Sequence, residues 1–489
     1  MRTEAMYLIG IDLGTTGCKS MVFDEAGTIL GEHYIEYDVI FLPGGGAEQD
    51  ANIWWDHTAT AVRGAIAQAG IDGSEVGGLS VSAQGCCFVP VDEKGLPLAN
   101  AISWYDTRAL PEARALYERH GAAAMFHRVG RPVESLVFPE LIRLKRLHPD
   151  LYEKTWKFLM PHDYLICRLS GAAVTDYSMA SGSMCYDVAR HAWASDLLEE
   201  YGIDERKLPE LRDAGTRAGT VTPETAALLG ISPDAVVAVG MQDQKIAALG
   251  AGIGPGRITV SLGTASAIET MSDTFVEDPA CVVPCHSFDS RLYTMETIVD
   301  TAGSALKWAK NTVCPELGYR EMDALAAVSP CGANGVTFYP FLCRNAAGVN
   351  QGGFRGIGLE TTRGDLIRAV LEGVACGIRS RIEEQKALLP HAAEAAELML
   401  FGGGSASPLW RRIIADVTGM TVRRPRTQET GNLGAAICAG VGAGVYRDLW
   451  DGQRIVGEPS SSDAPDPANR AACEELYARY CALREEVLK

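Results

Sequence analysis

Short alternations of apolar and polar residues open the chain, and longer helical periodicities follow them. Residues 7–12 and 19–23 fit two β-strands joined by the turn Gly-Thr-Thr-Gly. From Asp50, apolar residues recur three and four positions apart, which predicts an amphipathic helix with Asp50 as N-cap and Gly70 as its stop. A further strand is predicted at residues 78–82. The first region is therefore expected to be an α/β structure.

The second half of the chain repeats this opening pattern. The segment "ITVSLGTASAIE", residues 258–269, repeats the Leu-Gly-Thr core of "IGIDLGTTGCKSMVFD", residues 9–24. A predicted strand at residues 235–239 leads into a Gly- and Ala-rich stretch near Ile246. With 489 residues, the chain is also too long for a single hydrophobic core. We therefore expect two domains, residues 1–246 and 247–489, each opening with one hairpin.

Capping signals locate two helices in the second half. Thr362-x-x-Asp365 is a capping-box arrangement at the start of a long amphipathic run. After "ELMLFGGG", which reads as a strand and a glycine loop, Ser407 suits the N-cap of a helix and Gly419 its stop. The segment "GEPSSSDAPDP" predicts a linker, and the last twenty or so residues predict a charged terminal helix.

Composition and charge limit the classes of molecule that the chain is expected to bind. The chain is 47% hydrophobic and 22% charged, as is ordinary for a globular protein, and its formal net charge is −18. That charge argues against a nucleic acid or an anionic membrane as partner, so any phosphate ligand must be held by local groups. The 14 cysteines form no Cys-x-x-Cys pair, and the sequence shows neither a secretion signal nor a run of about 20 apolar residues. We therefore expect a cytoplasmic protein that does not enter a membrane.

The first hairpin has the composition of a phosphate-binding loop. In "DLGTT" the backbone N–H groups of Gly14, Thr15 and Thr16, with two hydroxyls, form a cradle for a phosphoryl group. Asp12 precedes them at the position of a carboxylate that holds Mg²⁺ or its water. The alternative is a plain turn between strands. The second copy has Ser261 in place of Asp12, so only the first is expected to serve a metal.

Two further motifs suit nucleotide binding and catalysis. Gly402, Gly403 and Gly404 lie between a predicted strand and a helix N-terminus, where bare backbone accepts a base or a phosphate, although tight turns use glycine for conformational reasons alone. Asp243 follows a predicted strand and starts a helix. It is either an N-cap or a general base that deprotonates a substrate hydroxyl.

The segment "WYDTR" is a candidate for sugar recognition. It places Trp104, Asp106 and Arg108 at alternate positions, which point to one face if the segment is extended. An aromatic wall with a carboxylate and a guanidinium suits a polyhydroxylated small molecule. The alternative is a surface ion pair beside a buried tryptophan.

Together these residues resemble the FGGY family of carbohydrate kinases. The most specific match is "GGFRGIGLETTRGDLIRAVLE", residues 352–372, and further similarity covers "AEQDANIWW", "VTDYSMAS", "GGGSASPLWRRIIADVTG" and "GNLGAA". The resemblance implies two ribonuclease H-like domains, as in the superfamily of actin, hexokinase and the heat-shock chaperones. ATP and sugar are expected to meet in an interdomain cleft.

The resemblance also implies roles for individual residues. Asp12 matches the family's magnesium-associated aspartate and Asp243 its catalytic base. The ATP- and phosphate-binding positions are Gly14, Thr15, Thr16, Lys19, Gly263, Thr264, Gly403 and Gly404. The sugar-binding positions are Gln84, Gly85, Cys86, Trp104, Asp106, Arg108 and Asp243. ATP and Mg²⁺ are the implied cofactors, a small sugar or polyol is the implied partner, and a homodimer is common in relatives.

The substrate turn departs from the family pattern. Xylulokinases usually carry Gln-Met-His there and glycerol kinases Gln-Arg-Glu, whereas "SAQGCC" keeps Gln84 and continues with Gly85 and Cys86. A ketopentose such as xylulose is the expected substrate. The alternatives are another sugar, polyol or aldonic acid, of the gluconate, L-xylulose or erythritol type. Two rivals remain: an ATP-switched binding protein on the same superfold, and an inactive sugar sensor.

Overall fold

The chain forms two compact units. The computed structural model describes residues 6–132, 134, 136–343, 352–389 and 395–488. Unit 1 comprises Met1–Gly250, Ser272–Thr294 and Glu429–Val456, and unit 2 comprises Ala251–Met271, Met295–Gln428 and Gly457–Lys489. The chain first leaves unit 1 close to the expected division at residue 246, but two later segments return to it.

Unit 1 is built on a mixed sheet. Strands β1 (Tyr7–Leu13), β2 (Gly17–Phe23) and β3 (Ile29–Glu36) form an antiparallel meander. The alternating pattern predicted β1 and β2, whereas β3 was not predicted. On the other side of β1, the parallel strands β6 (Val76–Ala83) and β15 (Val236–Ala238) follow, and β14 (Arg217–Thr220) closes the edge. The strand predicted at residues 78–82 is thus β6.

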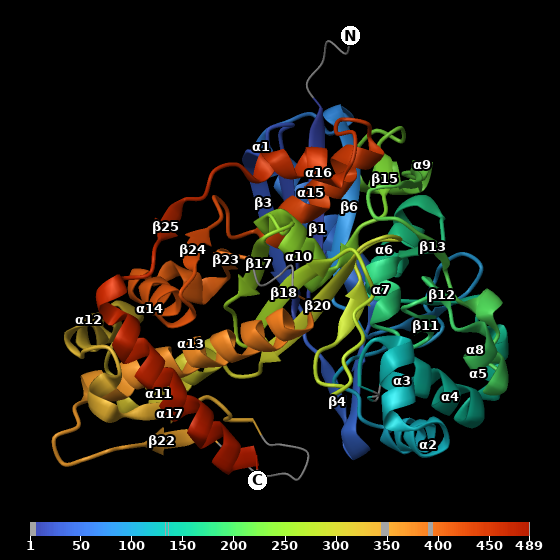
Figure 1. The fold of residues 1–489 in the computed structure, drawn as a ribbon. Helices are drawn as coiled ribbons and strands as arrows, with labels where there is room; N and C mark the ends of the chain where they lie inside the picture. Colours follow the sequence, from blue (N-terminus) through green and yellow to red (C-terminus); the bar gives the residue numbers. More distant parts are fainter. Residues whose placement is uncertain (1–5, 133, 135, 344–351, 390–394, 489) are drawn as a thin grey trace. The chain divides into compact units, whose positions relative to one another are not determined.

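Two helices from opposite ends of the sequence cover the two faces of this sheet. Helix α1 (Ala51–Ala69) begins at the N-cap Asp50 and ends at Gly70 in the left-handed conformation, as predicted. Its buried residues share a hydrophobic core with Ile9 and Ile11. Helix α15 (Thr430–Gly442) packs on β1 and β6 (Figure 1). A Cβ at Gly10 would lie 2.0 Å from the Asn432 carbonyl oxygen, so only glycine permits this contact.

The region after β6 in unit 1 is largely helical. The helices are α2 (Leu110–His120), α3 (Ala122–Val129), α4 (Val137–Leu147), α5 (Pro149–Lys154), α6 (Pro161–Ser170), α7 (Tyr177–Ser181), α8 (Ser195–Glu200) and α9 (Pro223–Leu229). The short strands are β7 (Val89–Val91), β9 (Lys157–Leu159), β10 (Val174–Asp176) and β13 (Glu210–Arg212). A core that includes Phe88, Phe138 and Phe158 joins half of its elements, among them α2, α3 and α4.

Unit 2 repeats the central strand order of unit 1. The antiparallel hairpin of β17 (Arg257–Ser261) and β18 (Ser266–Ser272) is followed by the parallel strands β23 (Glu397–Phe401) and β24 (Thr421–Arg424). Helix α13 (Arg363–Leu388) starts at the predicted Thr362 capping box and packs against α11 (Gly303–Val313), α12 (Tyr319–Val328) and α14 (Pro408–Thr418). Ser407 caps α14 and Gly419 ends it, as predicted.

The predicted linker after residue 456 is instead part of the second sheet. Strand β25 (Ser461–Asp463) pairs antiparallel with β24, and Asp463 accepts a 2.7 Å ion pair from Arg411 of α14. The linker prediction was wrong because β24, nearly forty residues earlier, supplies the pairing partner. The terminal helix α17 (Arg470–Leu488) is present as expected. Among the helices of the described residues, none has the length and apolar character needed to cross a lipid bilayer.

Candidate functional site

Three neighbouring strands of unit 1 bring the two candidate catalytic carboxylates to one edge of the sheet. In register, Asp12 of β1 lies beside Ser82 of β6, and Ser82 lies beside Met241 of β16 (Met241–Gln242). Strands are about 4.8 Å apart, so Asp12 and Met241 lie on the order of 10 Å apart. Asp243 follows β16 directly and opens helix α10 (Asp243–Ala251). Strand register thus brings these two carboxylates to one region of unit 1.

Asp12 is held by its neighbour in the sheet. Ser82 Oγ donates a 2.6 Å hydrogen bond to Asp12 Oδ1. Burial raises the pKa of Asp12; the bond from Ser82 opposes that shift, and the carboxylate of Glu429 adds to it. A Cβ at Gly431, in the first turn of α15, would lie 3.5 Å from the Asp12 carboxyl group, so this helix leaves the carboxylate room. A cation bound beside this buried carboxylate would stabilise its ionised form.

The Gly-Thr-Thr-Gly turn is a tight loop with exposed polar groups. Gly14 N–H donates to the Gly17 carbonyl at 2.9 Å, and Tyr37 Oη donates to the Gly14 carbonyl. Gln49 Nε2 donates to the Thr15 carbonyl at 2.8 Å, which fixes the turn to the strand before α1. Thr16 is exposed at the tip. The hydroxyls that the sequence assigns to phosphate binding are therefore presented by a braced backbone.

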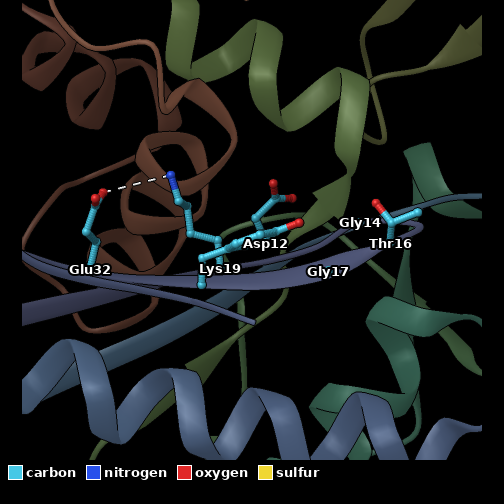
Figure 2. Close-up of a pocket in the computed structure, with 7 residues that line it drawn as sticks. Asp12, Gly14, Thr16, Gly17, Lys19 and Glu32 are labelled. Carbon is cyan, nitrogen blue, oxygen red and sulfur yellow. Dashed lines mark ion pairs between the residues drawn. The ribbon is translucent and has the colours of Figure 1, made fainter. Parts of the chain in front are cut away.

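A pocket of about 420 Å³ lies over this hairpin (Figure 2). Asp12, Thr16 and Lys19 project from the same side of it. Lys19 Nζ lies 2.9 Å from Glu429 Oε1 and 3.8 Å from Glu32 Oε2. The remaining lining residues are Gly14, Gly17 and Tyr34. The pocket thus combines one cation with several carboxylates. Such a site can accept a phosphate that is bound to a metal ion, because the carboxylates attract the metal.

Asp243 is oriented by its own neighbours in sequence. Gln244 N–H donates to Asp243 Oδ1 at 2.7 Å, and Gln242 Nε2 donates to the same oxygen. Gln242 is fixed in turn, because its N–H donates to Ser178 Oγ at 3.0 Å. The carboxylate is only partly buried. Asp243 is therefore a partly exposed carboxylate whose Oδ1 is oriented by its neighbours in sequence.

The substrate turn follows β6 directly. Gln84 is buried and donates from Nε2 to Gln49 Oε1 at 2.9 Å, so it positions the backbone of the turn. A Cβ at Gly85 would lie 3.1 Å from Gln242 Cγ. Cys86 has a φ of 62°, an uncommon value for a side chain with a Cβ. The thiol of Cys86 donates to the Gly182 carbonyl at 3.3 Å and accepts from Arg131 Nη1 at 3.2 Å.

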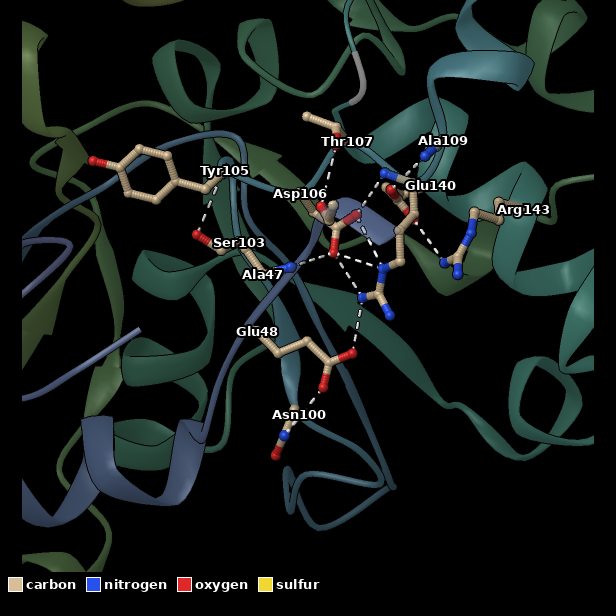
Figure 3. A network of polar contacts seen from close by, with 12 residues as sticks. Ala47, Glu48, Asn100, Ser103, Tyr105, Asp106, Thr107, Ala109, Glu140 and Arg143 are labelled. Carbon is tan, nitrogen blue, oxygen red and sulfur yellow. Dashed lines mark hydrogen bonds and ion pairs between the residues drawn. The ribbon is translucent and has the colours of Figure 1, made fainter. Parts of the chain in front are cut away.

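The "WYDTR" segment is not extended, and its three candidate residues do not share one face. Trp104 is 41% exposed, and its Nε1 donates to Thr15 Oγ1 at 3.1 Å, so it lies at the phosphate turn. Asp106 is buried; it accepts from Ala47 N–H at 2.8 Å and from Arg108 Nε at 2.8 Å (Figure 3). These contacts hold the pKa of Asp106 below its usual range despite burial. The Asp106–Arg108 pair is thus part of a structural network.

Glu48 and Glu140 complete that network. Arg108 Nη2 lies 2.8 Å from Glu48 Oε1 (Figure 3). Glu140 Oε1 accepts from Ala109 N–H at 3.0 Å, and its other oxygen lies 3.2 Å from Arg143 Nη1. Burial, followed by repulsion from Asp106, raises the pKa of Glu140 to about 7. The segment is therefore a braced loop whose exposed residues are Trp104, Tyr105 and Thr107.

Unit 2 holds the second hairpin in a different form. Ser261 Oγ accepts from Ala267 N–H at 3.1 Å, so the residue at the Asp12 position is used within its own hairpin. Gly263 N–H donates to the Ala265 carbonyl, a turn one residue tighter than that of the first hairpin. Thr264 accepts from Ser304 Oγ at 2.8 Å through its carbonyl. A Cβ at Gly303 would lie 2.5 Å from the Gly263 carbonyl oxygen.

The glycine loop of unit 2 joins β23 to α14, as predicted. Gly402 has a φ of 85°, which favours glycine, and a Cβ at Gly404 would lie 2.6 Å from Leu262 Cγ, so side-chain packing explains the second glycine. A Cβ at Gly403 meets no atom within 4 Å. Ser405 Oγ donates to Gln428 Oε1 at 2.7 Å. Among these three glycines, Gly403 is therefore the one for which no contact within the fold requires the absence of a side chain.

Sequence reasoning missed three residues close to these sites. Ser82 orients Asp12, and its only signal was a hydroxyl at a strand end. Arg131 contacts Cys86 from 45 positions away, for which the sequence offered no signal. Lys245 is only 2% exposed although it follows Asp243 by two positions. A lysine so close to a candidate base was a signal that the sequence alone did offer.

Comparison with known families accounts for most of the chain. Residues 7–250 match the FGGY family of carbohydrate kinases, N-terminal domain, and residues 258–443 match the C-terminal domain of the same family. These two matches cover the hairpins, Asp12, Asp243 and the glycine loop.

Individual relatives and solved structures agree with the family match. The chain is 30% identical over 447 residues to the xylulose kinase of Staphylococcus xylosus, covering 89% of this chain and 91% of the relative. It is 27% identical over 482 residues to the L-xylulose/3-keto-L-gulonate kinase of Escherichia coli, with 97% and 96% coverage. The crystal structure of xylulose kinase from Rhodospirillum rubrum superposes with a TM-score of 0.89 at 28% identity, covering 98% and 99%. The predicted α/β fold with two ribonuclease H-like domains is confirmed.

Proposed function

Since the chain belongs to the FGGY family of carbohydrate kinases, and is thus a sugar kinase that uses ATP as phosphate donor, we propose that it phosphorylates a keto sugar of the xylulose type. The observation that carries this proposal is the register that brings Asp12 and Asp243 to one sheet edge. One carboxylate beside a phosphate loop and a second beside a substrate turn are the parts that phosphoryl transfer to an alcohol requires.

Asp243 is the general base of the proposed reaction. Its Oδ1 is held by Gln244 N–H and Gln242, so the carboxylate cannot rotate away from a substrate hydroxyl. The hydroxyl oxygen attacks the γ-phosphorus in line, the bond to the β-phosphate oxygen breaks, and the hydroxyl proton passes to Asp243. Asp243 also positions the acceptor before transfer. No covalent enzyme intermediate is required.

Asp12 and the first hairpin serve the phosphates. The donor set fits Mg²⁺, because Asp12 is an enclosed carboxylate whose pKa burial has raised, beside exposed threonine hydroxyls. Asp12 would hold the metal or one of its waters, and a metal ion there supplies positive charge to the phosphate oxygens. The backbone N–H groups of Thr15 and Thr16 and the ammonium group of Lys19 are proposed to donate to the same oxygens, whereas the Gly14 N–H is used within the turn. Gly263, Thr264, Gly403 and Gly404 of unit 2 are proposed to bind the nucleotide.

The substrate assignment rests on the relatives and on the turn after β6. Two of the relatives are named xylulose kinase and L-xylulose/3-keto-L-gulonate kinase, and both names specify keto sugars. The turn of Gln84, Gly85 and Cys86 presents backbone and a thiol to the acceptor. A second candidate is an acidic sugar, favoured by the contact of Arg131 with Cys86.

A substrate screen tests the kinase function directly. The purified chain is incubated with ATP, Mg²⁺ and one acceptor at a time: pentuloses, hexuloses, pentitols, glycerol and aldonic acids. We expect ADP release to depend on one class of small acceptor, with the phosphorylated sugar identified by mass spectrometry. ADP release that no sugar stimulates, or that only a protein or self-assembly stimulates, refutes the proposal in favour of an ATP-driven switch.

A further inference from the structure

Two thiols of unit 2 lie in contact. Cys331 Sγ is 3.3 Å from Cys473 Sγ, although the two residues are 142 positions apart in the sequence. All 14 cysteines of the chain lie among the described residues, and all are free thiols. A disulfide bond is about 2.05 Å long, so these two sulfurs need to approach by only about 1.3 Å to form one. A small rotation of the side chains is therefore enough to bring them to bonding distance.

The backbone beside Cys331 is held by two helices. Cys331 lies just before the short helical turn Ala333–Gly335. Next to it, Gly332 has a φ of 86°, and its N–H donates to Glu372 Oε1 of α13 at 3.0 Å. The Gly332 carbonyl accepts from Arg479 Nη2 of α17 at 3.3 Å. Cys331 is thus presented to α17 by a braced turn.

The two thiols differ in their access to solvent. Cys473 lies in the first turn of α17, is 1% exposed and belongs to the hydrophobic core of unit 2. Cys331 packs against the same core but is partly exposed. A small dissolved oxidant therefore reaches Cys331 first.

The two thiols also differ in their ionisation. The hydrogen bond from the Cys473 thiol lowers the pKa of Cys331, and the positive charge of Arg368 adds to this effect, whereas burial and nearby carboxylates oppose it. The pKa of Cys473 is raised, because its thiol donates that bond and is buried. The thiolate is the form of cysteine that reacts with an oxidant. Cys331 is therefore both the more accessible and the more easily ionised member of the pair.

We propose that Cys331 and Cys473 are a reversible oxidation site, which takes a peroxide as its oxidant and whose disulfide fastens the terminal helix α17 to the rest of unit 2. The site contains no residue assigned to the sugar, the nucleotide or the metal. This inference goes beyond the proposed kinase function and does not rest on it, so its tests use neither an acceptor nor ATP.

The oxidation proceeds in two steps. The Cys331 thiolate attacks one oxygen of hydrogen peroxide and the O–O bond breaks; Cys331 becomes a sulfenic acid, and the other oxygen leaves as water with the proton that Cys331 released. The Cys473 sulfur then attacks the Cys331 sulfur and the S–O bond breaks, so that the hydroxyl group leaves with the Cys473 proton as a second water. Two thiols thus lose two electrons in total, and one peroxide is reduced to two waters. A small dithiol reverses the reaction by thiol–disulfide exchange.

The disulfide changes unit 2 in a defined way. It closes a segment of 142 positions that runs from the turn before β21 (Thr337–Tyr339) to the first turn of α17. Helix α17 packs against β21, α13 and α14, so the bond holds it covalently where it already lies. A cross-link over so long a segment lowers the entropy of the unfolded chain. Oxidation is therefore expected to raise the melting temperature.

Peptide mapping of the oxidised chain tests the pairing. The fully reduced chain is treated with equimolar hydrogen peroxide, its remaining thiols are blocked with N-ethylmaleimide, and it is digested without reduction. We expect a cross-linked pair of peptides that contains Cys331 and Cys473 and that dithiothreitol separates. The exposed thiol of Cys343 reports how far the oxidant has acted. A free thiol at Cys331 once Cys343 is oxidised, or a bond from Cys331 to any other cysteine, overturns the proposal.

Single substitutions assign the two roles. In C473A the second step is lost, so the sulfenic acid of Cys331 should persist and be trapped by dimedone. In C331S, Cys473 should remain a thiol, because it is buried. C343S, at an exposed cysteine of the same unit, is the matched control and should form the disulfide as the unmodified chain does. Oxidation of Cys473 in C331S as fast as that of Cys343 overturns the assigned roles.

Melting temperatures test the fastening of α17. Peroxide should raise the melting temperature of the unmodified chain and of C343S by about 3 °C or more, and dithiothreitol should reverse the shift. C331S and C473A should show no shift, and their reduced forms should melt close to the reduced unmodified chain. If the buried substitution C473A lowers stability by itself, C331S alone carries this comparison. A shift that C331S retains, or equal melting temperatures of the reduced chain and the mapped disulfide form, overturns the proposal.

Discussion

The two units share a strand order but differ in what their loops contain. In unit 1 half of the candidate residues are ionisable, including Asp12, Lys19 and Asp243, whereas in unit 2 the candidates are three glycines and one threonine. At the position of Asp12, unit 2 has Ser261, whose hydroxyl accepts a hydrogen bond inside its own hairpin. The two copies therefore share their strand order but carry different functional groups in their loops. Unit 1 is expected to set turnover, and unit 2 to set nucleotide affinity.

The largest effect should come from the proposed base of unit 1. Asp243→Asn retains the shape of the side chain but cannot accept the hydroxyl proton, so we expect kcat to fall by about 10³-fold. ATP binding should persist, and it can be measured as the increase in melting temperature that the nucleotide causes. Asp234→Asn, at an exposed loop position of unit 1, is the control. Near-normal turnover of Asp243→Asn would refute the assignment of Asp243 as the general base.

The two hairpins can be compared at a single equivalent position. Asp12→Asn removes the carboxylate proposed to hold the metal, and we expect kcat to fall by about 10²-fold with a higher Mg²⁺ requirement. Ser261→Ala removes only a local hydrogen bond, worth about 1 kcal/mol of stability, and should leave kcat within about twofold. Magnesium titrations of both variants measure the contrast. Similar losses in the two would show that the copies are functionally equivalent.

The glycine loop of unit 2 should affect binding and not turnover. A Cβ at Gly403 meets no protein atom, so Gly403→Ala should fold normally and project a methyl group into the proposed nucleotide site. We expect KM for ATP to rise about tenfold, which corresponds to about 1.4 kcal/mol, with kcat nearly unchanged. Gly254→Ala, another glycine of unit 2 with open space around its Cβ, is the control. An unchanged KM for ATP in Gly403→Ala would show that this loop does not contact the nucleotide.

The smallest effect concerns the stability of unit 1 as a function of pH. Glu140 keeps its proton in the folded chain up to about pH 7, whereas an unfolded glutamate loses it near pH 4.5. The folded state therefore binds more protons in this window, and stability falls as pH rises through it. Glu140→Gln should flatten the decline of melting temperature between pH 4.5 and 7.5, unlike the exposed Glu153→Gln on α5. Parallel curves for Glu140→Gln and the unmodified chain would contradict the assigned pKa.

Features with local causes were predicted well from the sequence. The caps of α1 at Asp50 and Gly70, and those of α13 and α14, depend on residues within one turn of the helix end. The two hairpins were recognisable because alternation and glycine turns are also local signals. The family resemblance added the pairing of domains and is confirmed by the family matches.

Features with distant causes were not predicted. The "WYDTR" segment folds into a loop because Asp106 accepts from Ala47 N–H, 59 positions away. The supposed linker forms β25 because β24 offers a free edge. Arg131 and Lys245 come close to His286 only through the fold. The assigned roles of individual site residues stay predictions, because they describe contacts with ligands.

Helix α15 completes unit 1 from the far end of the chain, and this has a consequence for synthesis. Asn432 Nδ2 donates to the carbonyl oxygens of Gly10 and Lys19, across more than four hundred residues. While the ribosome is still translating unit 2, the emerging sheet of unit 1 lacks the cover of one face. A nascent chain thus carries exposed β1 and β6 until residues 430–442 have been synthesised, and a chaperone that shields them can act throughout that interval.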